Sequence, residues 1–221
     1  RFSKTGRAKW LGHLDLVRIF ERAVRTSGID VVYSEGFNPR PRIALLSALP
    51  LGATADADVL TIRLHPGSDV TKLLTGLNAR LPEGLKVYDL TFIRGTVRPP
   101  AINAGEFVLG VELPDGFSKE DLRKAVDLIM SQEAIMIDRG KEGHTKSVNL
   151  REGIISLELN EAAYNGNCEL RTIVNHGDFT VRPSEIIELV GRSIPGIQLI
   201  STRRSRLIFR CANGSANCDI K

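Results

Sequence analysis

The order in which helical and extended segments follow one another in the first 93 residues is the feature that most limits the possible folds. Apolar residues at helical spacing occur in two segments, 13–28 and 68–84, and β-rich runs lie before, between and after them. The resulting order is β-α-β-β-α-β, which is typical of the ferredoxin-like split βαβ module. We therefore predict that residues 1–94 form such a module.

The same order recurs in the second half of the chain, after a proline- and glycine-rich segment. Residues 95–104 contain Pro99 and Pro100 and are interpreted as a linker. Residues 105–210 again show the β-α-β-β-α-β order, although no residue-level repeat accompanies it, and residues 211–221 are interpreted as a flexible tail. The predicted fold class is thus α+β, with two tandem ferredoxin-like modules.

Composition indicates a globular protein that does not cross a membrane. Hydrophobic residues make up 42% and charged residues 25% of the 221 residues. No apolar run approaches the roughly 18 residues of a membrane span, and no signal-peptide pattern is visible. The three cysteines are odd in number and form no CxxC motif, so we expect a reducing compartment, the cytoplasm. A metal or redox pair of Cys211 and Cys218 in the tail is the alternative interpretation.

Positive charge is concentrated in the first fifty residues. This stretch holds nine Lys and Arg residues against four Asp and Glu residues, whereas the whole chain has a formal net charge of +4. Arg18, Arg22 and Arg25 are spaced i, i+4 and i+7, which places them on one face of the first predicted helix. That face is either a solvated surface, on which Glu21 pairs with Arg18 or Arg25, or a stripe of phosphate contacts.

The segment YSEGFNPRPRI, residues 33–43, is longer and stiffer than a simple turn. Two prolines flank Arg40 and hold it in extended backbone, and Arg42 follows the second proline. Phe37 is the only large apolar residue inside the loop. It is either a plug in the core, which we favour, or a stacking platform for a base. With Asn38 beside it, the segment predicts binding rather than catalysis, because arginine is not a general base near neutral pH.

His13 lies where the first predicted strand meets the first helix, next to the free N–H groups of a helix N-terminus. It is a candidate helix cap, a candidate phosphate contact and a candidate general base. As a base it would make the chain a metal-independent endoribonuclease, with Lys9 stabilising the transition state. We favour a structural or anion-contacting role over catalysis.

The sequence contains no complete catalytic or metal-binding motif. The other three histidines show no HxH, HExxH or Cys/His spacing, so we predict no metal site and no cofactor. There is no GxGxxG, P-loop, GxSxG or CxxxCxxC motif. Asp56 and Asp58 are interpreted as part of a solvated loop rather than as a Mg²⁺ site. Arg204 and Arg206 are interpreted as charges on a solvated strand edge.

The first fifty residues resemble the radical SAM-linked protein family, an uncharacterised bacterial group. The family hallmark is a start of the form F-x-K-x-G-x-x-x-x-L-x-H-L-D followed by Y-S-x-G-F-N-P-x-P. This sequence carries both parts, in Phe2, Lys4, Gly6, Leu11, His13, Leu14, Asp15, Tyr33, Ser34, Gly36, Phe37, Asn38, Pro39 and Pro41. Gly12 departs from the serine often found there, which removes any hydroxyl contact at that position. Looser matches continue to about residue 210.

The resemblance implies a companion of a radical SAM protein, either fused behind it or encoded beside it. A first residue other than methionine fits the fused arrangement, and it fits a shortened chain equally well. The resemblance also implies an RNA-related role, because neighbouring genes of the family often encode RNA-processing and ribosomal proteins. We therefore expect a non-catalytic RNA-binding or substrate-presenting module, with a radical SAM protein and RNA as its partners.

The predicted RNA- and phosphate-binding residues are Lys4, Lys9, His13, Arg18, Arg22, Arg25, Phe37, Asn38, Arg40 and Arg42. Two alternatives stay open beside this hypothesis. One is the endoribonuclease that uses His13. The other is a protein-interaction module whose loop at residues 33–43 docks on the radical SAM enzyme.

Overall fold

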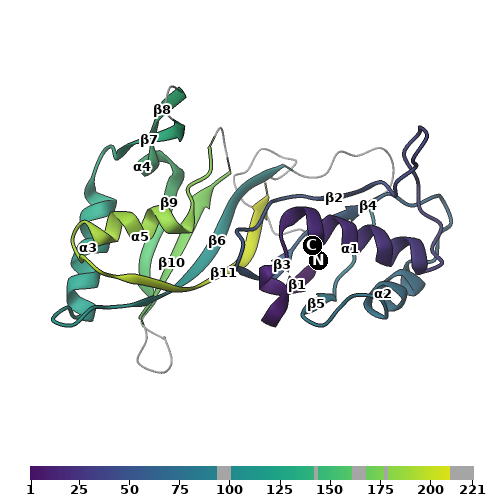
Figure 1. Ribbon diagram of the computed structural model, residues 1–221, viewed down its shortest axis with the longest axis horizontal. Coiled ribbons are helices and arrows are strands. Elements are labelled where there is room, and N and C mark those ends of the chain that lie inside the picture. The colour runs from purple at the N-terminus through teal and green to yellow at the C-terminus, as the bar shows by residue number, and fades with distance from the viewer. Residues whose placement is uncertain (94–100, 142–143, 161–167, 177–178, 210–221) are drawn as a thin grey trace. The chain divides into compact units, whose positions relative to one another are not determined.

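A computed structural model of the chain consists of two compact units (Figure 1). It describes residues 1–93, 101–141, 144–160, 168–176 and 179–209. Unit 1 contains Arg1–Ile102 and Arg204–Lys221, and unit 2 contains Asn103–Arg203. The last strand therefore contributes its first half to unit 2 and its second half to unit 1.

In its described residues, unit 1 contains a sheet, a separate strand pair and two α-helices. Its elements are β1 (Phe2–Lys4), the 3₁₀ helix η1 (Gly6–Trp10), α1 (His13–Thr26), β2 (Ile43–Leu45), β3 (Thr54–Asp58), β4 (Leu60–Ile62), α2 (Val70–Asn78), β5 (Leu85–Val87) and the second half of β11 (Gln198–Phe209). The sheet has the order β5-β1-β3-β11, and β1 is antiparallel to both of its neighbours. β2 and β4 form a two-stranded antiparallel sheet of their own.

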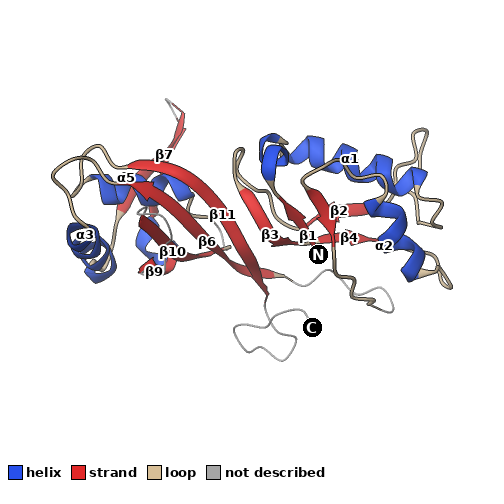
Figure 2. Ribbon diagram, turned by 90° about the horizontal axis from the view of Figure 1, so that it is seen from below, coloured by secondary structure: helices blue, strands red, loops and turns tan. Residues whose placement is uncertain are grey.

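Apolar side chains from both helices and from the sheet form the core of unit 1. α1 contributes Phe20 and Val24, and α2 contributes Leu73 and Leu77. Phe2 of β1 meets Phe20 edge to face, with ring centroids 5.0 Å apart. Figure 2 shows α1 lying against the strands of this unit. One face of α1 is thus committed to the core, and the opposite face is left to solvent.

Unit 2 contains a second sheet, a separate hairpin and three α-helices among its described residues. Its elements are β6 (Ile102–Glu112), α3 (Lys119–Ser131), β7 (Met136–Lys141), β8 (His144–Asn149), α4 (Leu150–Gly153), β9 (Ile154–Asn160), β10 (Cys168–Asn175), α5 (Pro183–Gly191) and the first half of β11. The sheet has the order β11-β6-β10-β9, with β10 antiparallel to β6 and β9. β7 and β8 pair only with each other, and Arg139 of β7 joins this hairpin to Glu185 of α5 through two hydrogen bonds.

Three helices begin at residues whose chemistry suits a helix N-terminus. The Asp69 carboxylate caps α2 by accepting a hydrogen bond from the Thr71 backbone N–H at 3.0 Å. Ser118 and Asp121 form a capping box at the start of α3. Pro183 stands in the first turn of α5, where its missing N–H costs no intrahelical hydrogen bond.

The predicted α+β fold class is confirmed, but two tandem ferredoxin-like modules are not. In unit 1, β2 and β4 lie outside the main sheet, and β11 pairs with β3 instead. The second half of β11 carries three buried apolar residues, Leu207, Ile208 and Phe209. In unit 2, the hairpin of β7 and β8 adds an element that the predicted order lacks.

The described residues cover the predicted segment boundaries only in part. Residues 94–100 of the predicted linker at 95–104 lie outside them, and Ile102 is already the first residue of β6. The predicted tail at 211–221, with its two cysteines, lies outside them as well. Each helix in the described ranges is too short or too polar to cross a membrane.

Candidate nucleic-acid interface

Residues 32–42 form a closed hairpin, which follows α1 in Figure 1. Near its base, the backbone N–H of Arg42 donates to the Val32 carbonyl at 2.8 Å. Nearer its tip, the Ser34 N–H donates to the Arg40 carbonyl at 2.8 Å, and the Arg40 N–H donates to the Ser34 hydroxyl oxygen at 3.0 Å. The segment that the sequence marked as a stiff loop is therefore held by hydrogen bonds along both arms.

The tip of the 32–42 hairpin presents an aromatic side chain to solvent. Phe37 has a relative exposure of 106%, and Asn38 beside it is also exposed. The favoured interpretation of Phe37 as a core plug is therefore wrong. The hydrogen bonds that close the hairpin hold its tip away from the core, so the ring is available for stacking.

Two contacts join the hairpin to α1. The Arg25 guanidinium donates a hydrogen bond to the Pro39 carbonyl at 3.2 Å. The Arg40 guanidinium lies 3.9 Å from the Glu21 carboxylate, whereas the sequence predicted a partner for Glu21 on α1 itself. Exposed contacts of this kind contribute little to stability, but they fix the hairpin beside the second half of the helix.

The solvent-facing side of α1 carries a row of arginines. Arg18, Arg22 and Arg25 are all exposed, whereas Leu16 and Phe20 on the opposite face are buried. This separation confirms that the predicted spacing puts the three guanidinium groups on one face. With the hairpin fixed beside it, the helix face becomes continuous with the hairpin arginines.

Arg63 is a further exposed arginine and lies opposite Arg42, although no local sequence pattern indicates it. Ile43 of β2 pairs with Ile62 of β4, so Arg42 and Arg63 are the next cross-strand neighbours. The Arg63 backbone N–H donates to the Arg42 carbonyl at 2.9 Å, and both side chains are exposed. Like charges directly opposite each other on paired strands destabilise a sheet unless an anion lies between them. No local sequence signal joins residues 42 and 63, because only the strand register brings them together.

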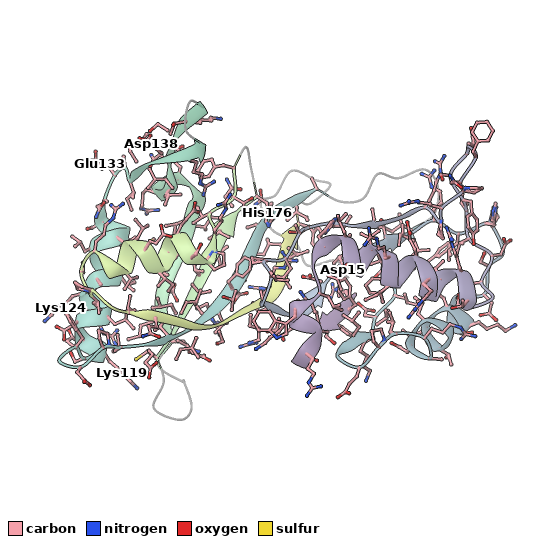
Figure 3. All side chains as sticks on the ribbon, viewed as in Figure 1. Asp15, Lys119, Lys124, Glu133, Asp138 and His176 are labelled. Carbon is pink, nitrogen blue, oxygen red and sulfur yellow. The ribbon has the colours of Figure 1, made fainter. Side chains whose placement is uncertain are left out.

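The residues before α1 form the other end of this surface. The Lys9 ammonium lies 5.1 Å from the centre of the Trp10 ring, and Trp10 is 63% exposed. Gly12 is the N-cap residue of α1, and its N–H donates to the carboxylate of Asp15 at 3.3 Å. Figure 3 labels Asp15 in the first turn of the helix. The Asp15 carboxylate also lies 3.8 Å from the Arg18 guanidinium. It therefore contacts both the N-cap residue of α1 and the first arginine of the row.

His13 is the first residue of α1 and is exposed. It is therefore not the helix cap, which is Gly12. A general base is normally oriented by a third group, and the described residues place no hydrogen-bonding partner on the His13 ring. The endoribonuclease hypothesis stays a prediction.

Lys4 does not belong to the exposed surface. Its side chain is fully buried, and its Nζ donates a hydrogen bond to the Leu11 carbonyl at 2.9 Å. A strand alternates faces with a period of two, so Lys4 shares the inward face with Phe2. Burial lowers the pKa of the Lys4 ammonium, the Asp58 carboxylate raises this pKa, and the Arg204 guanidinium lowers it again. The structure does not support the predicted phosphate contact by Lys4.

Asp58 and Arg204 are buried with Lys4, which corrects the interpretation of both as solvated residues. Arg204 is 1% exposed, and its guanidinium donates two hydrogen bonds of 2.7 Å to the Asp58 carboxylate. The same guanidinium donates to the Ser47 hydroxyl at 2.9 Å and to the Ala48 carbonyl at 3.0 Å. We call Lys4, Asp58 and Arg204 the buried ionic cluster of unit 1.

The buried ionic cluster holds two surface segments in place. Lys4 fixes the Leu11 carbonyl, two residues before α1 begins. Arg204 fixes the turn at Ser47 and Ala48, and the chain then runs on to Gly52, against which the Trp10 ring packs. The cluster therefore has a positioning role beneath the surface that carries Trp10 and His13.

The pH dependence of stability tests whether Lys4 is buried. In the unfolded chain its pKa is close to the ordinary 10.5, and in the folded chain it is lower. Between the two values the unfolded chain binds more protons, so the contribution of Lys4 to the free energy of unfolding rises with pH. A Lys4→Met variant should lack this rise in urea unfolding as pH increases towards 10.5, whereas Lys86→Met, at an exposed position of β5, should keep it. Equal pH slopes in the wild type and Lys4→Met would contradict the prediction.

Metal and catalytic groups are not gathered anywhere in the described part of the chain. Within these ranges, no group of three or more His, Cys, Asp or Glu side chains is arranged to hold a metal ion. The candidate interface therefore consists of arginines and exposed aromatic rings on one unit. Such a surface can bind an anionic, base-carrying polymer.

Comparisons with known proteins identify a family and a similar fold. The model of a bacterial family described as "Uncharacterized protein conserved in bacteria (DUF2344)" matches residues 1–183. No curated protein matches the chain. A chain of a Cbf5–Nop10–Gar1 complex has a TM-score of 0.52 and 12% identity, over 93% of this chain and 47% of that one. This chain thus spans about half the length of the similar chain, and at that identity the likeness shows the fold alone.

Proposed function

We propose that this chain, which belongs to the DUF2344 family of bacterial proteins, is a non-catalytic RNA-binding or substrate-presenting module that acts with a radical SAM protein. One observation carries the proposal. The fully exposed Phe37 stands on a hydrogen-bonded hairpin whose arginines are continuous with the arginine row of α1.

The chemistry of the surface favours a nucleic acid. Guanidinium groups match phosphate oxygens in geometry as well as in charge, and exposed arginines outnumber the acidic side chains beside them. The arginine pair at positions 42 and 63 has like charges on neighbouring strands, and a bridging phosphate relieves their repulsion. Single-stranded binding proteins combine phosphate contacts with exposed aromatic rings, and Phe37 supplies such a ring at the tip of the hairpin.

The radical SAM partner rests on the sequence resemblance. Hallmark residues lie in the first turn of α1 and in the 32–42 hairpin, where they include Phe37 and Asn38 of the candidate interface. The buried Lys4 and Phe2 of the same hallmark lie underneath. Because hallmark residues help to form this surface, we expect family members that carry the hallmark to bind the same kind of ligand.

RNA binding by a hairpin variant tests the proposal. The wild type should bind labelled total bacterial RNA at low salt. The affinity of Arg40→Ala/Arg42→Ala should be lower by about tenfold or more, because two phosphate contacts are lost. Arg80→Ala/Arg192→Ala is the matched control, since it removes the same charge from exposed positions outside the interface. Filter binding at two salt concentrations measures the effect.

The two possible failures of this experiment have different meanings. Equal losses in the hairpin variant and the control would mean that only net charge matters, and the hairpin would not be a binding element. If neither the wild type nor the variants bind RNA, the proposal fails. In that case the exposed Phe37 favours the second candidate function, a docking module in which the ring anchors a protein interface.

A further inference from the structure

Trp10 is a second aromatic platform at the far end of α1. Its ring lies against Gly52, where a Cβ atom would stand 3.2 Å from the indole. The Gly52 N–H also donates to the Lys9 carbonyl at 2.9 Å, which ties this turn to η1. The indole is therefore held in place from one side and is still 63% exposed.

The two platforms stand at opposite ends of one helix. Trp10 lies three positions before the first residue of α1. The hairpin that carries Phe37 is joined to the other end of the helix, by a hydrogen bond from Arg25 in the last turn of α1. A helix of 14 residues is about 21 Å long. Arg18 and Arg22 are exposed between the two ends.

We propose that the ligand of this surface is a single-stranded nucleic acid that lies along α1, with one base on Trp10, one base on Phe37 and its phosphates on the arginine row. This inference rests on the proposed function and adds the strandedness and the length of the ligand. A single strand offers free base faces to both rings, whereas the bases of a duplex are stacked on one another. At a stacked rise of about 3.4 Å per nucleotide, about six nucleotides span the helix.

Trp10 is the only tryptophan of the chain, so its fluorescence reports directly on this platform. A single-stranded hexanucleotide should quench the fluorescence on binding, because a base stacks on the indole. A duplex of the same length should bind more weakly and leave the fluorescence unchanged. Equal affinity for the two, or the same quenching by both, would overturn the inference.

Variants test the two platforms separately. Trp10→Leu and Phe37→Leu should each weaken binding of the hexanucleotide by about five- to 150-fold, the range that loss of one stacked base gives. Trp10→Phe keeps a ring and should retain most of the affinity. Phe92→Leu, which removes an exposed aromatic outside this surface, is the matched control and should have no effect. A trinucleotide is too short to reach both rings, so Phe37→Leu should not change the quenching that it causes at Trp10.

The outcomes separate this inference from the proposed function. Salt-sensitive RNA binding that depends on the hairpin arginines, without quenching of Trp10, would overturn the two-platform ligand and leave the RNA-binding proposal standing. No RNA binding under any condition would overturn both.

Discussion

An Asp58→Ala variant should lose about 3–5 kcal/mol of its free energy of unfolding. Asp58 is 3% exposed and accepts two hydrogen bonds of 2.7 Å from Arg204. Removing its carboxylate leaves the cations of Arg204 and Lys4 together in the interior of unit 1, where neither is well solvated. Urea unfolding followed by circular dichroism measures the change. Asp30→Ala, which breaks an exposed pair with His65, should change stability by less than about 1 kcal/mol.

A double variant separates the cost of an unpaired charge from the value of the ion pair. Replacing a whole buried pair with apolar side chains is often neutral or stabilising. Asp58→Leu/Arg204→Met should therefore be more stable than Asp58→Ala, even though it also removes the hydrogen bonds to Ser47 and Ala48. The role given to the buried ionic cluster would be wrong if Asp58→Ala and Asp30→Ala unfolded at the same urea concentration.

Patterns among residues close together in the sequence predicted most of the helix and hairpin that form the candidate interface. The apolar spacing of residues 13–28 predicted α1 and its arginine face, and the prolines around Arg40 predicted a stiff segment. These features depend on residues within a few positions of one another, so the sequence contains the whole signal. The helix caps at Asp69 and Ser118 were predictable for the same reason.

Contacts between distant residues were not predictable in this way. Arg204 and Asp58 are 146 positions apart, and each looks like an ordinary surface charge in its own segment. Arg63 joins Arg42 only through the register of β2 and β4. Lys4 is a different case. Its position two residues after the core residue Phe2 placed it on the inward face of a strand, and this alternation was a signal that the interpretation as a phosphate contact overlooked.

The position of Phe37 was predicted wrongly because large apolar residues are usually buried. A large apolar residue between polar neighbours usually packs into a core, and the sequence analysis assigned it there. The hairpin instead closes on itself through Ser34 and Arg40, which leaves the tip without a core to reach. The exposure of Phe37 supports a binding role only together with the closed hairpin that presents the ring and the arginines beside it.

Binding of single-stranded RNA should weaken by a few hundred-fold between about 50 and 200 mM salt. Six arginines are exposed on α1, on the 32–42 hairpin and on the strand beside its base: Arg18, Arg22, Arg25, Arg40, Arg42 and Arg63. If each neutralises one phosphate, the logarithm of the affinity falls with the logarithm of the salt concentration at a slope of about −4. The triple variant Arg18→Ala/Arg22→Ala/Arg25→Ala should reduce the slope to about −2, because half of the contacts are gone.

A lysine triple variant distinguishes charge from geometry on the helix face. Arg18→Lys/Arg22→Lys/Arg25→Lys keeps three positive charges, so it should keep the wild-type slope while binding somewhat more weakly at every salt concentration, since lysine lacks the planar fork of arginine. Fluorescence anisotropy of a labelled single-stranded RNA that carries at least six internucleotide phosphates gives both quantities over a salt series. An unchanged slope in the alanine variant would mean that the phosphates do not lie on α1, and the ligand would then contact the hairpin alone.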